Sequence, residues 1–363
     1  MDELKIACVG DIMCGDSFYD VGHGVASGLS KYGRGFLRAE IINFLCGHDV
    51  VLGNVECALS DEGRKSHILR TVHMRGRPIA SRYLAGWGVT ITNVANNHIL
   101  EHGYVAAIDT VRNLQESGVR TIGVGKNRLF QRGLQVEEIS CGGRVLAFIG
   151  LCLCREKYAF NGGAEPAEIL EQLQMLTRQD KIVCISVHWG DEFMDRPSIR
   201  QKEMAHAFVE AGAKLVIGHH PHVVQGVETY KGGLIAYSLG NFIFDSIVDD
   251  CCWSVILSLT LRGQEVVRWR CLPIESDGDF RPVMARGYRI GELEREIARR
   301  SELLQNDEAK DKYQEKYEVD FKLRSARARH QLRQKLYKKS WQIRPIYWPQ
   351  VLFRPIQRRL GLW

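Results

Sequence analysis

At 363 residues with 45% hydrophobic and 25% charged side chains, the chain has the composition of a globular protein, which excludes disordered and collagen-like classes. The net charge of +6 is unevenly distributed, because residues 321–363 contain twelve Lys and Arg and neither Asp nor Glu. Residues 1–320 therefore carry a net charge of −6, so we expect a mildly acidic body followed by a basic segment.

Two features bear on the cell compartment. No apolar run reaches the roughly 18 residues that a membrane-spanning helix needs, and the chain enters a strand pattern at once without an export signal. The eleven cysteines are odd in number and most lie in apolar segments, which favours a reducing compartment over a disulfide framework. We expect a cytoplasmic protein, peripheral on the inner face of the cell membrane if its basic segment binds lipid.

The first two thirds of the chain alternate between two kinds of segment. Short apolar, β-branched segments predict strands at 4–9, 49–55, 88–95, 120–124, 144–151, 181–187, 214–218 and 233–239. Between several of them, apolar residues recur at spacings of three and four and predict helices at 35–46, 104–117, 165–178 and 199–211. The alternation predicts an α/β fold.

Beyond residue 238 the pattern changes. Two strands follow one another at 254–261 and 265–274 with only a turn between them, which predicts antiparallel pairing and hence mixed sheets. From Gly287 the chain becomes helical, polar and then basic. We expect two packed mixed sheets with helices outside them in a domain of residues 1–285, followed by a helical, basic and aromatic extension of residues 286–363.

Polar side chains follow five of the predicted strands, at the edge where open α/β sheets place ligands. Carboxylate, carboxamide and imidazole groups occur there, and together they form a mixed oxygen and nitrogen shell that suits Zn²⁺, Mn²⁺ or Fe²⁺ better than Ca²⁺. A loop around Pro221 could direct the histidines on both sides of it inward. The residues are Asp11, Asn54, Glu56, Asn96, Asn97, His98, His188, His219, His220 and His222.

Each motif taken alone has a structural explanation. The Asn-Asn-His segment 96–98 can cap the following helix, and Asp11 after a glycine can belong to a simple turn. Cys152 and Cys154 have the spacing of a soft-metal site, but a strand cysteine more often packs as a small buried hydrophobic residue. Three histidines within four positions at 219–222 are harder to explain in this way. Because five strand ends carry such groups, the sequence favours a metal site.

Five motifs also carry a resemblance to a known family. They are GDIMCGD at 10–16, GNVECALS at 53–60, NVANNHILEHG at 93–103, SVHWGDEF at 186–193 and GHHPHVVQGVETYKGGLIAYSLGNFIFD at 218–245. In this order, over residues 4–275, they resemble the CapA family of capsule and poly-γ-glutamate synthesis proteins, a branch of the calcineurin-like metallophosphoesterases. The resemblance implies a four-layer α/β/β/α sandwich of two mixed sheets and one or two divalent metal ions, Mn²⁺, Zn²⁺ or Fe²⁺.

The resemblance further implies roles for individual residues. His98 would hydrogen-bond a substrate oxygen or protonate the leaving group, as a histidine with a pKa near neutrality can do. Glu56 would bridge two metals, with Asn54 as the alternative. The other implied ligands are Asp11 and His222 for the first metal and Asn97, His188 and His220 for the second.

Two positions depart from the family pattern. Metallophosphoesterases usually begin with Asp-x-His, but Met13 stands where that histidine would be, so the first metal lacks one imidazole. Glu101 replaces the aspartate of an NNHxxDxG motif, and it either orients His98 or a ligand, or is a solvated carboxylate at a helix start. His219 and Asn241 are expected beside the ligands or the substrate.

The basic segment carries aromatic residues among its cations. We expect it to lie on an anionic membrane surface or a partner, where each cation contributes about 1 kcal/mol. The alternatives are docking on the acidic body of the same chain and, least favoured, binding of nucleic acid. The residues expected to make these contacts are Lys335, Lys338, Lys339, Trp341 and Trp348.

Three functions are consistent with the sequence. The first is a metal-dependent hydrolase of the CapA type that cleaves a phosphoester or a polymer-linked bond, together with capsule or polymer synthesis machinery; retention of His98 favours it. The second is a non-catalytic assembly factor of a capsule or poly-γ-glutamate synthesis complex, which the loss of an imidazole at Met13 favours. The third is a nucleic-acid phosphodiesterase, because a fold does not determine its substrate.

Overall fold

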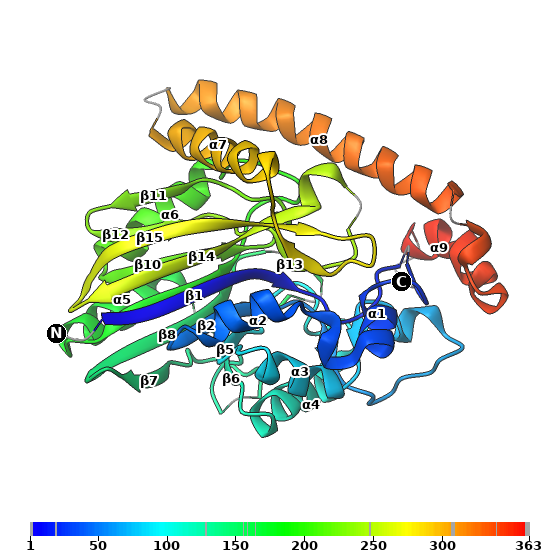
Figure 1. Cartoon of the computed structure of the whole chain (residues 1–363), viewed down its shortest axis with the longest axis horizontal. Helices are drawn as coiled ribbons and strands as arrows, with labels where there is room; N and C mark the ends of the chain where they lie inside the picture. The colour runs from blue at the N-terminus through cyan, green and yellow to red at the C-terminus, as the bar shows by residue number, and fades with distance from the viewer. Residues whose placement is uncertain are drawn as a thin grey trace.

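The computed structural model describes residues 3–18, 20–127, 129–154, 156–157, 159–163, 165–246, 248–305, 309–338 and 340–359. Two sheets pack face to face, and helices cover the outer face of each of them (Figure 1). The expected four-layer α/β/β/α sandwich of two mixed sheets is confirmed.

The first sheet is built around the first strand of the chain. β1 (Glu3–Ile12) lies parallel to β2 (Val50–Val55) on one side and antiparallel to β14 (Trp253–Arg262) on the other. β14 pairs with only the first part of β1, and the short β13 (Asn241–Ile243) pairs in parallel with its last two residues. This exchange of partners brings a later segment of the chain beside the end of β1.

Both sides of this sheet extend further. β5 (Ile91–Asn93) and β6 (Arg120–Ile122) add in parallel beyond β2. β15 (Glu265–Ser276) and β16 (Pro282–Met284) add in antiparallel fashion beyond β14. The predicted hairpin of two consecutive strands is therefore present as β14 and β15.

The second sheet has a parallel centre and antiparallel edges. β8, β9, β10 and β12 are parallel, whereas β7 and β11 pair antiparallel at opposite edges. The bounds are β7 (Glu137–Cys141), β8 (Arg144–Cys152), β9 (Ile182–His188), β10 (Ala213–His219), β11 (Val227–Tyr230) and β12 (Gly233–Ala236).

Apolar side chains fill the space between the sheets and both outer interfaces. Ile6 and Leu52 of the first sheet meet Phe148 and Ile217 of the second in the central core. Burial of such side chains is the main favourable term in folding, about 25 cal/mol per Å² of apolar surface. The first sheet is covered by α1 (Val25–Tyr32), α2 (Ala39–Cys46), α3 (Ile79–Gly86) and α4 (Gly103–Glu116), and the second by α5 (Pro166–Arg178) and α6 (Ile199–Glu210).

Three helices differ from the prediction. The segment 35–46 begins with a 3₁₀ turn (Gly33–Phe36), and the α-helix starts only at Ala39. Helices α1 and α3 were not predicted, because each is eight residues long and contains a glycine, which weakens the helical pattern.

The helical extension is present and packs on the body. It contains α7 (Tyr288–Glu302), α8 (Lys310–Lys338) and α9 (Trp348–Arg359), and α8 runs along one side of the molecule, orange in Figure 1. Leu293 and Ile297 of α7 join the core between the two sheets. No helix within the described residues is long and apolar enough to cross a membrane. A domain division after residue 285 would fall between β16 and α7, and it remains a prediction.

Candidate metal centre

Strand pairing places the predicted polar groups side by side. Asp11 of β1 is in register with Asn54 of β2 on one side and with Asn241 of β13 on the other. In the second sheet, His188 at the end of β9 is in register with His219 at the end of β10. Because parallel strands end at the same edge of a sheet, both sheets present these groups at one edge of the sandwich.

The residues expected to hold metal lie in a single cluster centred on Glu56. Glu56 Oε1 is 3.7 Å from Nε2 of both His188 and His222, and Asn97 Oδ1 is 2.9 Å from His188 Nε2. Glu56 belongs to two groups of three residues whose ligand atoms, within each group, lie within 4.8 Å of one another. The groups are Glu56 with His220 and His222, and Glu56 with Asp11 and His188. The ligand cluster, as we call it below, consists of Asp11, Glu56, Asn97, His188, His220 and His222, all buried.

The loop after β10 directs two histidines into the ligand cluster, as the sequence suggested. His220 and His222, on either side of Pro221, have positive φ angles of 97° and 59°. Such angles are unfavourable for residues with a Cβ atom and typically cost about 1–3 kcal/mol, so they persist only where the surroundings impose them. Here the His220 N–H donates a hydrogen bond to Asp11 Oδ2 at 3.2 Å, which holds the loop against the end of β1.

Unpartnered polar atoms show that a cation fits this cluster. Both carboxylate oxygens of Glu56 are fully buried without a hydrogen-bond partner within the described residues, and so is Nδ1 of His220. Burial, opposed in part by the charge of His222, raises the pKa of Glu56 well above its usual value. A buried carboxylate surrounded by imidazoles and lacking donors is stabilised by a bound cation, which supplies the missing partner.

Burial and neighbouring charges also shift the pKa values of the other groups in the ligand cluster. Burial opposes ionisation of Asp11, yet hydrogen bonds from His219 and His222 hold its pKa well below the usual value. Burial likewise opposes the charge on His222, but Glu56 and Asp11 raise its pKa to about 10. Burial and the neighbouring His220 lower the pKa of His188 well below the usual value, which leaves it neutral with a lone pair for a metal. A metal would displace the proton from His222.

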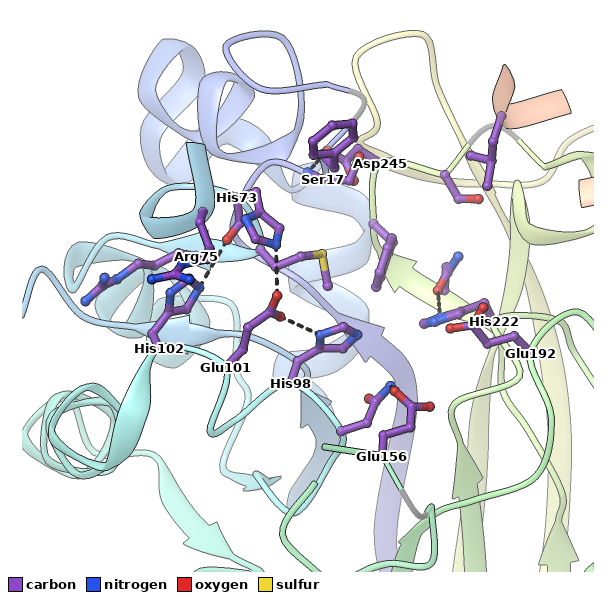
Figure 2. A pocket seen from close by; sticks show the side chains of 18 of the residues that line it. Ser17, His73, Arg75, His98, Glu101, His102, Glu156, Glu192, His222 and Asp245 are labelled. Carbon is purple, nitrogen blue, oxygen red and sulfur yellow. Dashed lines mark hydrogen bonds and ion pairs between the residues drawn. The ribbon is translucent and has the colours of Figure 1, made fainter. Parts of the chain in front are cut away.

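A hydrogen-bonded chain extends from His98 at the border of the cluster (Figure 2). His98 Nδ1 is 2.7 Å from Glu101 Oε2, and His73 Nε2 is 2.8 Å from Glu101 Oε1. Since an ionised carboxylate can only accept, both histidines donate to it. Burial would raise the pKa of Glu101, but these two hydrogen bonds hold it well below the usual value. Glu101 is therefore not a solvated carboxylate; it orients His98.

The residues expected beside the ligands do contact them. Asn54 Nδ2 donates to Asp11 Oδ1 at 2.8 Å, and His219 Nδ1 lies 3.2 Å from the same oxygen. Asn241 Oδ1 is 2.9 Å from His222 Nδ1. Met13 is buried, and its sulfur accepts a hydrogen bond from the Gly15 N–H, so no imidazole stands at that position.

Two residues of the site, Glu156 and His73, were missed by the sequence reasoning, and a third, Cys154, was considered there as a soft-metal ligand but assigned to the core. Glu156 accepts a hydrogen bond from Asn97 Nδ2 at 2.9 Å, and Cys154 forms a possible ligand group with His188 and His220. Cys154 and Glu156 follow the predicted strand 144–151. The expectation that polar groups after the end of a strand belong to the site would therefore have included both. Cys152 packs in the core as favoured, but Cys154 does not. Nothing in the sequence singles out His73.

The basic segment departs from its expected role at one position. Lys335 is buried and forms an ion pair with Asp20, so the prediction that it contacts a membrane or a partner is wrong; an acidic pocket of the body takes up its charge. Lys338 and Trp341 are exposed, with Trp341 at 78%, and Trp348 is half-buried. Lys339 lies outside the described residues.

Two cavities open on the ligand cluster. The first, of about 760 Å³, reaches His98 and His222 and is the pocket drawn in Figure 2. The second, of about 780 Å³, reaches His220 from the side of α6 and α8. The residues that line both cavities, and thus mark their border, are Glu156, Glu192, Phe193 and Leu332.

Comparison with known families decides where the chain belongs. A family model described as "Bacterial capsule synthesis protein PGA_cap" matches residues 5–246, which include every residue of the ligand cluster. The chain belongs to this family. The resemblance to CapA proteins is thereby confirmed for this PGA_cap protein.

Individual relatives of this PGA_cap protein carry matching names. It is 28% identical over 295 residues to the capsule biosynthesis protein CapA of Bacillus anthracis, covering 78% of this chain and 70% of the relative. It is 27% identical over 282 residues to the PGA biosynthesis protein CapA of Bacillus subtilis, covering 76% and 72%. Among solved structures, a phosphatase from Mycoplasma pneumoniae is similar at a TM-score of 0.47 and 14% identity, covering 77% of this chain and 96% of that one.

Proposed function

We propose that this PGA_cap protein is a metal-dependent hydrolase that cleaves a phosphoester or a polymer-linked bond during the production of a capsule polymer. The observation that supports this most is the position of His98. Its Nε2 lies 3.8 Å from Glu56 Oε1, and its Nδ1 is held by Glu101. A cluster of metal-ligand groups thus has beside it a fixed imidazole that is free to transfer a proton.

The chemistry of the donors favours a first-row divalent ion. Carboxylate, carboxamide and imidazole groups suit Mn²⁺, Zn²⁺ or Fe²⁺. One or two such ions would supply Lewis-acid polarisation of a substrate oxygen and would neutralise charge on a phosphoester. The residues that would hold them are Asp11, Glu56, Asn97, His188, His220 and His222.

His98 is suited to act as a general acid. Burial would lower its pKa, but the hydrogen bond to Glu101 and the charge of that carboxylate raise it above the usual value. His98 therefore carries the proton that a leaving group needs, and Glu101 fixes the orientation in which Nε2 delivers it. His73 holds the other oxygen of Glu101 and keeps that carboxylate in place.

The test combines metal content with turnover. Wild-type protein should contain divalent metal by elemental analysis and should hydrolyse bis-p-nitrophenyl phosphate when Mn²⁺ is present. His98→Ala should lower kcat by about 10²–10⁴-fold, the usual contribution of a general acid, with unchanged metal content. The exposed His67→Ala is the matched control. Turnover that survives His98→Ala would refute the proposed role of this residue.

A second candidate function is that of a non-catalytic assembly factor, which the buried Met13 favours because it removes one imidazole from the first metal position. In that case wild-type protein would bind metal without hydrolysing any phosphoester, and His98→Ala would leave the polymer output of cells unchanged. Under either function we propose that the protein works with polymer synthesis machinery, since relatives are named for capsule and PGA biosynthesis.

A further inference from the structure

Cys154 follows the end of β8 and faces the second cavity. Cys152, two residues earlier, is 1% exposed in the core, whereas Cys154 is half-buried and lines that cavity. Because Cys152 is in register with His188, the chain beyond β8 passes beside the end of β9. There the Cys154 thiol donates to the His188 carbonyl at 3.7 Å, and the Leu153 N–H donates to the same carbonyl at 2.8 Å. These contacts hold the sulfur next to the ligand cluster.

The sulfur and two imidazoles of the ligand cluster form a group that suits one metal ion. Cys154 Sγ and one ring nitrogen each of His188 and His220 lie within 4.8 Å of one another. Two ligands of one zinc ion are at most about 4.4 Å apart, because a Zn–S bond is about 2.3 Å long and a Zn–N bond about 2.1 Å. The three atoms are therefore close to the separation at which one ion binds them all.

A buried nitrogen without a partner points to a ligand at the same place. His220 is 3% exposed, and within the described residues its Nδ1 has no hydrogen-bond partner. A buried polar atom that lacks a partner is unfavourable, so a bound cation stabilises it. His188 and His220 are also two of the ligands implied for the second metal, so the thiol would join a position that the ligand cluster already outlines.

The thiol reaches this position from a different side than the proposed general acid. Cys154 and His220 line the second cavity and not the first, whereas His98 and His222 line the first and not the second. A metal held by His188 and His220 would thus have Cys154 on the side of the second cavity. The side of the first cavity, where His98 lies, would remain available to a substrate.

We propose that Cys154 is a thiolate ligand of the metal ion that His188 and His220 hold, and that it makes this position selective for Zn²⁺ over Mn²⁺. A thiolate is a soft ligand, which suits Zn²⁺, whereas Mn²⁺ prefers oxygen ligands. On binding, the thiol releases its proton to solvent and the sulfur forms a bond to the metal. The proposal rests on the proposed function in that it concerns the same metal centre, and it adds a ligand outside the six residues that the family resemblance implies.

The test uses Co²⁺ as a coloured substitute for Zn²⁺ in full-length protein from which a chelator has removed all metal. A thiolate bound to Co²⁺ gives a sulfur-to-metal charge-transfer band in the near ultraviolet, which oxygen and nitrogen ligands do not give. The wild type should show this band at saturating Co²⁺, and Cys154→Ser should lack it. The matched control is Cys46→Ser, which replaces an exposed cysteine and should keep the band.

Affinities separate the loss of a ligand from a general disturbance of the site. In competition with a chromophoric chelator, Cys154→Ser should raise the Kd for Zn²⁺ by about tenfold or more, equivalent to about 1.4 kcal/mol. The same substitution should raise the Kd for Mn²⁺ by less than about twofold, because Mn²⁺ gains little from a thiolate. Circular dichroism verifies that each variant is folded.

Three results would overturn the proposal. They are a wild type without the charge-transfer band, a band that persists in Cys154→Ser, and equal losses of Zn²⁺ and Mn²⁺ affinity in that variant. Hydrolysis of bis-p-nitrophenyl phosphate by the wild type tests the proposed function on its own. A Cys154-dependent band without any hydrolysis would remove the hydrolase and keep the ligand, whereas hydrolysis by a wild type that shows no band would do the reverse.

Discussion

Glu56 shows at the scale of a single residue how function opposes stability. Its carboxylate is fully buried, both oxygens lack a partner within the described residues, and its pKa is raised above 4.5. A carboxyl group whose pKa is raised by folding opposes folding at any pH above its pKa in the unfolded chain. Glu56 therefore destabilises the metal-free protein at neutral pH. The same carboxylate becomes favourable once a cation is bound.

We predict opposite effects of Glu56→Gln in the two states. Without metal, the variant should be more stable by about 1–2 kcal/mol, because a buried charge is removed. Addition of Mn²⁺ should raise the Tm of the wild type, as any ligand of the native state does, and leave that of the variant unchanged. Thermal unfolding with EDTA and with Mn²⁺ measures both effects. The exposed Glu62→Gln serves as control and should respond to Mn²⁺ like the wild type. If Mn²⁺ raised the Tm of Glu56→Gln as much as that of the wild type, Glu56 would be excluded as a ligand.

At the scale of elements, two helices of the extension are fixed to the body by buried charge. Lys335 of α8 enters a pocket of carboxylates, where burial and the charges of Asp20 and Asp16 raise the pKa of Asp245 well above the usual value. Arg300 of α7 is 2% exposed, and its guanidinium donates to the Val224 carbonyl at 2.5 Å and to Glu296 at 2.7 Å. Removing one partner from such a site leaves an unpaired buried charge.

Lys335→Met should therefore lower the free energy of unfolding by about 3–5 kcal/mol, since Asp20 would remain buried without its cation. Replacing both partners, as Lys335→Met with Asp20→Leu, should restore much of the loss, because an apolar pair needs no counterion. Urea unfolding measures the difference. The control is Lys338→Met, which is exposed on the same helix and should change stability by less than about 0.5 kcal/mol. A Lys335→Met variant that is as stable as the wild type would contradict this prediction.

Glu296 makes the stability of α7 dependent on pH through ion pairs within the helix. Hydrogen bonds from Arg299 and, against the effect of burial, from Arg300 lower its pKa from 4.5 to about 2. A lowered carboxyl pKa stabilises the fold above 4.5, and this contribution is lost as the pH falls toward 2. Glu296→Gln should thus cost about 1 kcal/mol at neutral pH, allowing for partial solvent exposure. Urea unfolding at decreasing pH should show the free energies of unfolding of the wild type and Glu296→Gln converging. A difference between them that stays constant with pH would contradict this role of Glu296.

At the scale of the whole molecule, the charge segregation of the sequence is partly neutralised by folding. Three cations of α8, Arg324, Arg327 and Lys335, pair with acids of the body, which is one of the alternatives that the sequence left open. Beyond them, Trp341 is 78% exposed and Phe353 is 56% exposed, and Lys338 is exposed nearby in the chain. Exposed aromatic side chains among cations are typical of a segment that lies on an anionic lipid surface.

We predict that the protein binds vesicles containing phosphatidylglycerol and does not bind vesicles of phosphatidylcholine alone. Raising the salt concentration should weaken binding, because screening shortens the range of the attraction. Trp341→Ala combined with Phe353→Ala should lower the affinity about tenfold or more through lost apolar burial. Tyr288→Ala, an exposed aromatic residue of α7, is the control. Co-sedimentation measures binding, and equal binding to both kinds of vesicle would refute an electrostatic surface contact.

The sequence by itself indicated the fold class, most strands and all six residues of the ligand cluster. It could do so because alternation of apolar residues is a local property, and because the carboxyl ends of parallel strands share an edge wherever the strands lie. Asp11, Glu56 and His188 could be singled out from the ends of their strands alone. The short helices α1 and α3 could not, since eight residues with a glycine leave too weak a pattern.

Only the tertiary structure decided which groups touch. The partner exchange along β1 places Asn241 beside Asp11, and a contact between distant segments joins His73 to Glu101. Lys335 appeared in the sequence as one more surface cation, but packing of α8 buries it against Asp20. The physical reason is that burial and pairing depend on segments that are well separated along the chain, by 28 residues for His73 and Glu101 and by 315 for Lys335 and Asp20, meeting in space. No local pattern of the chain records such a meeting.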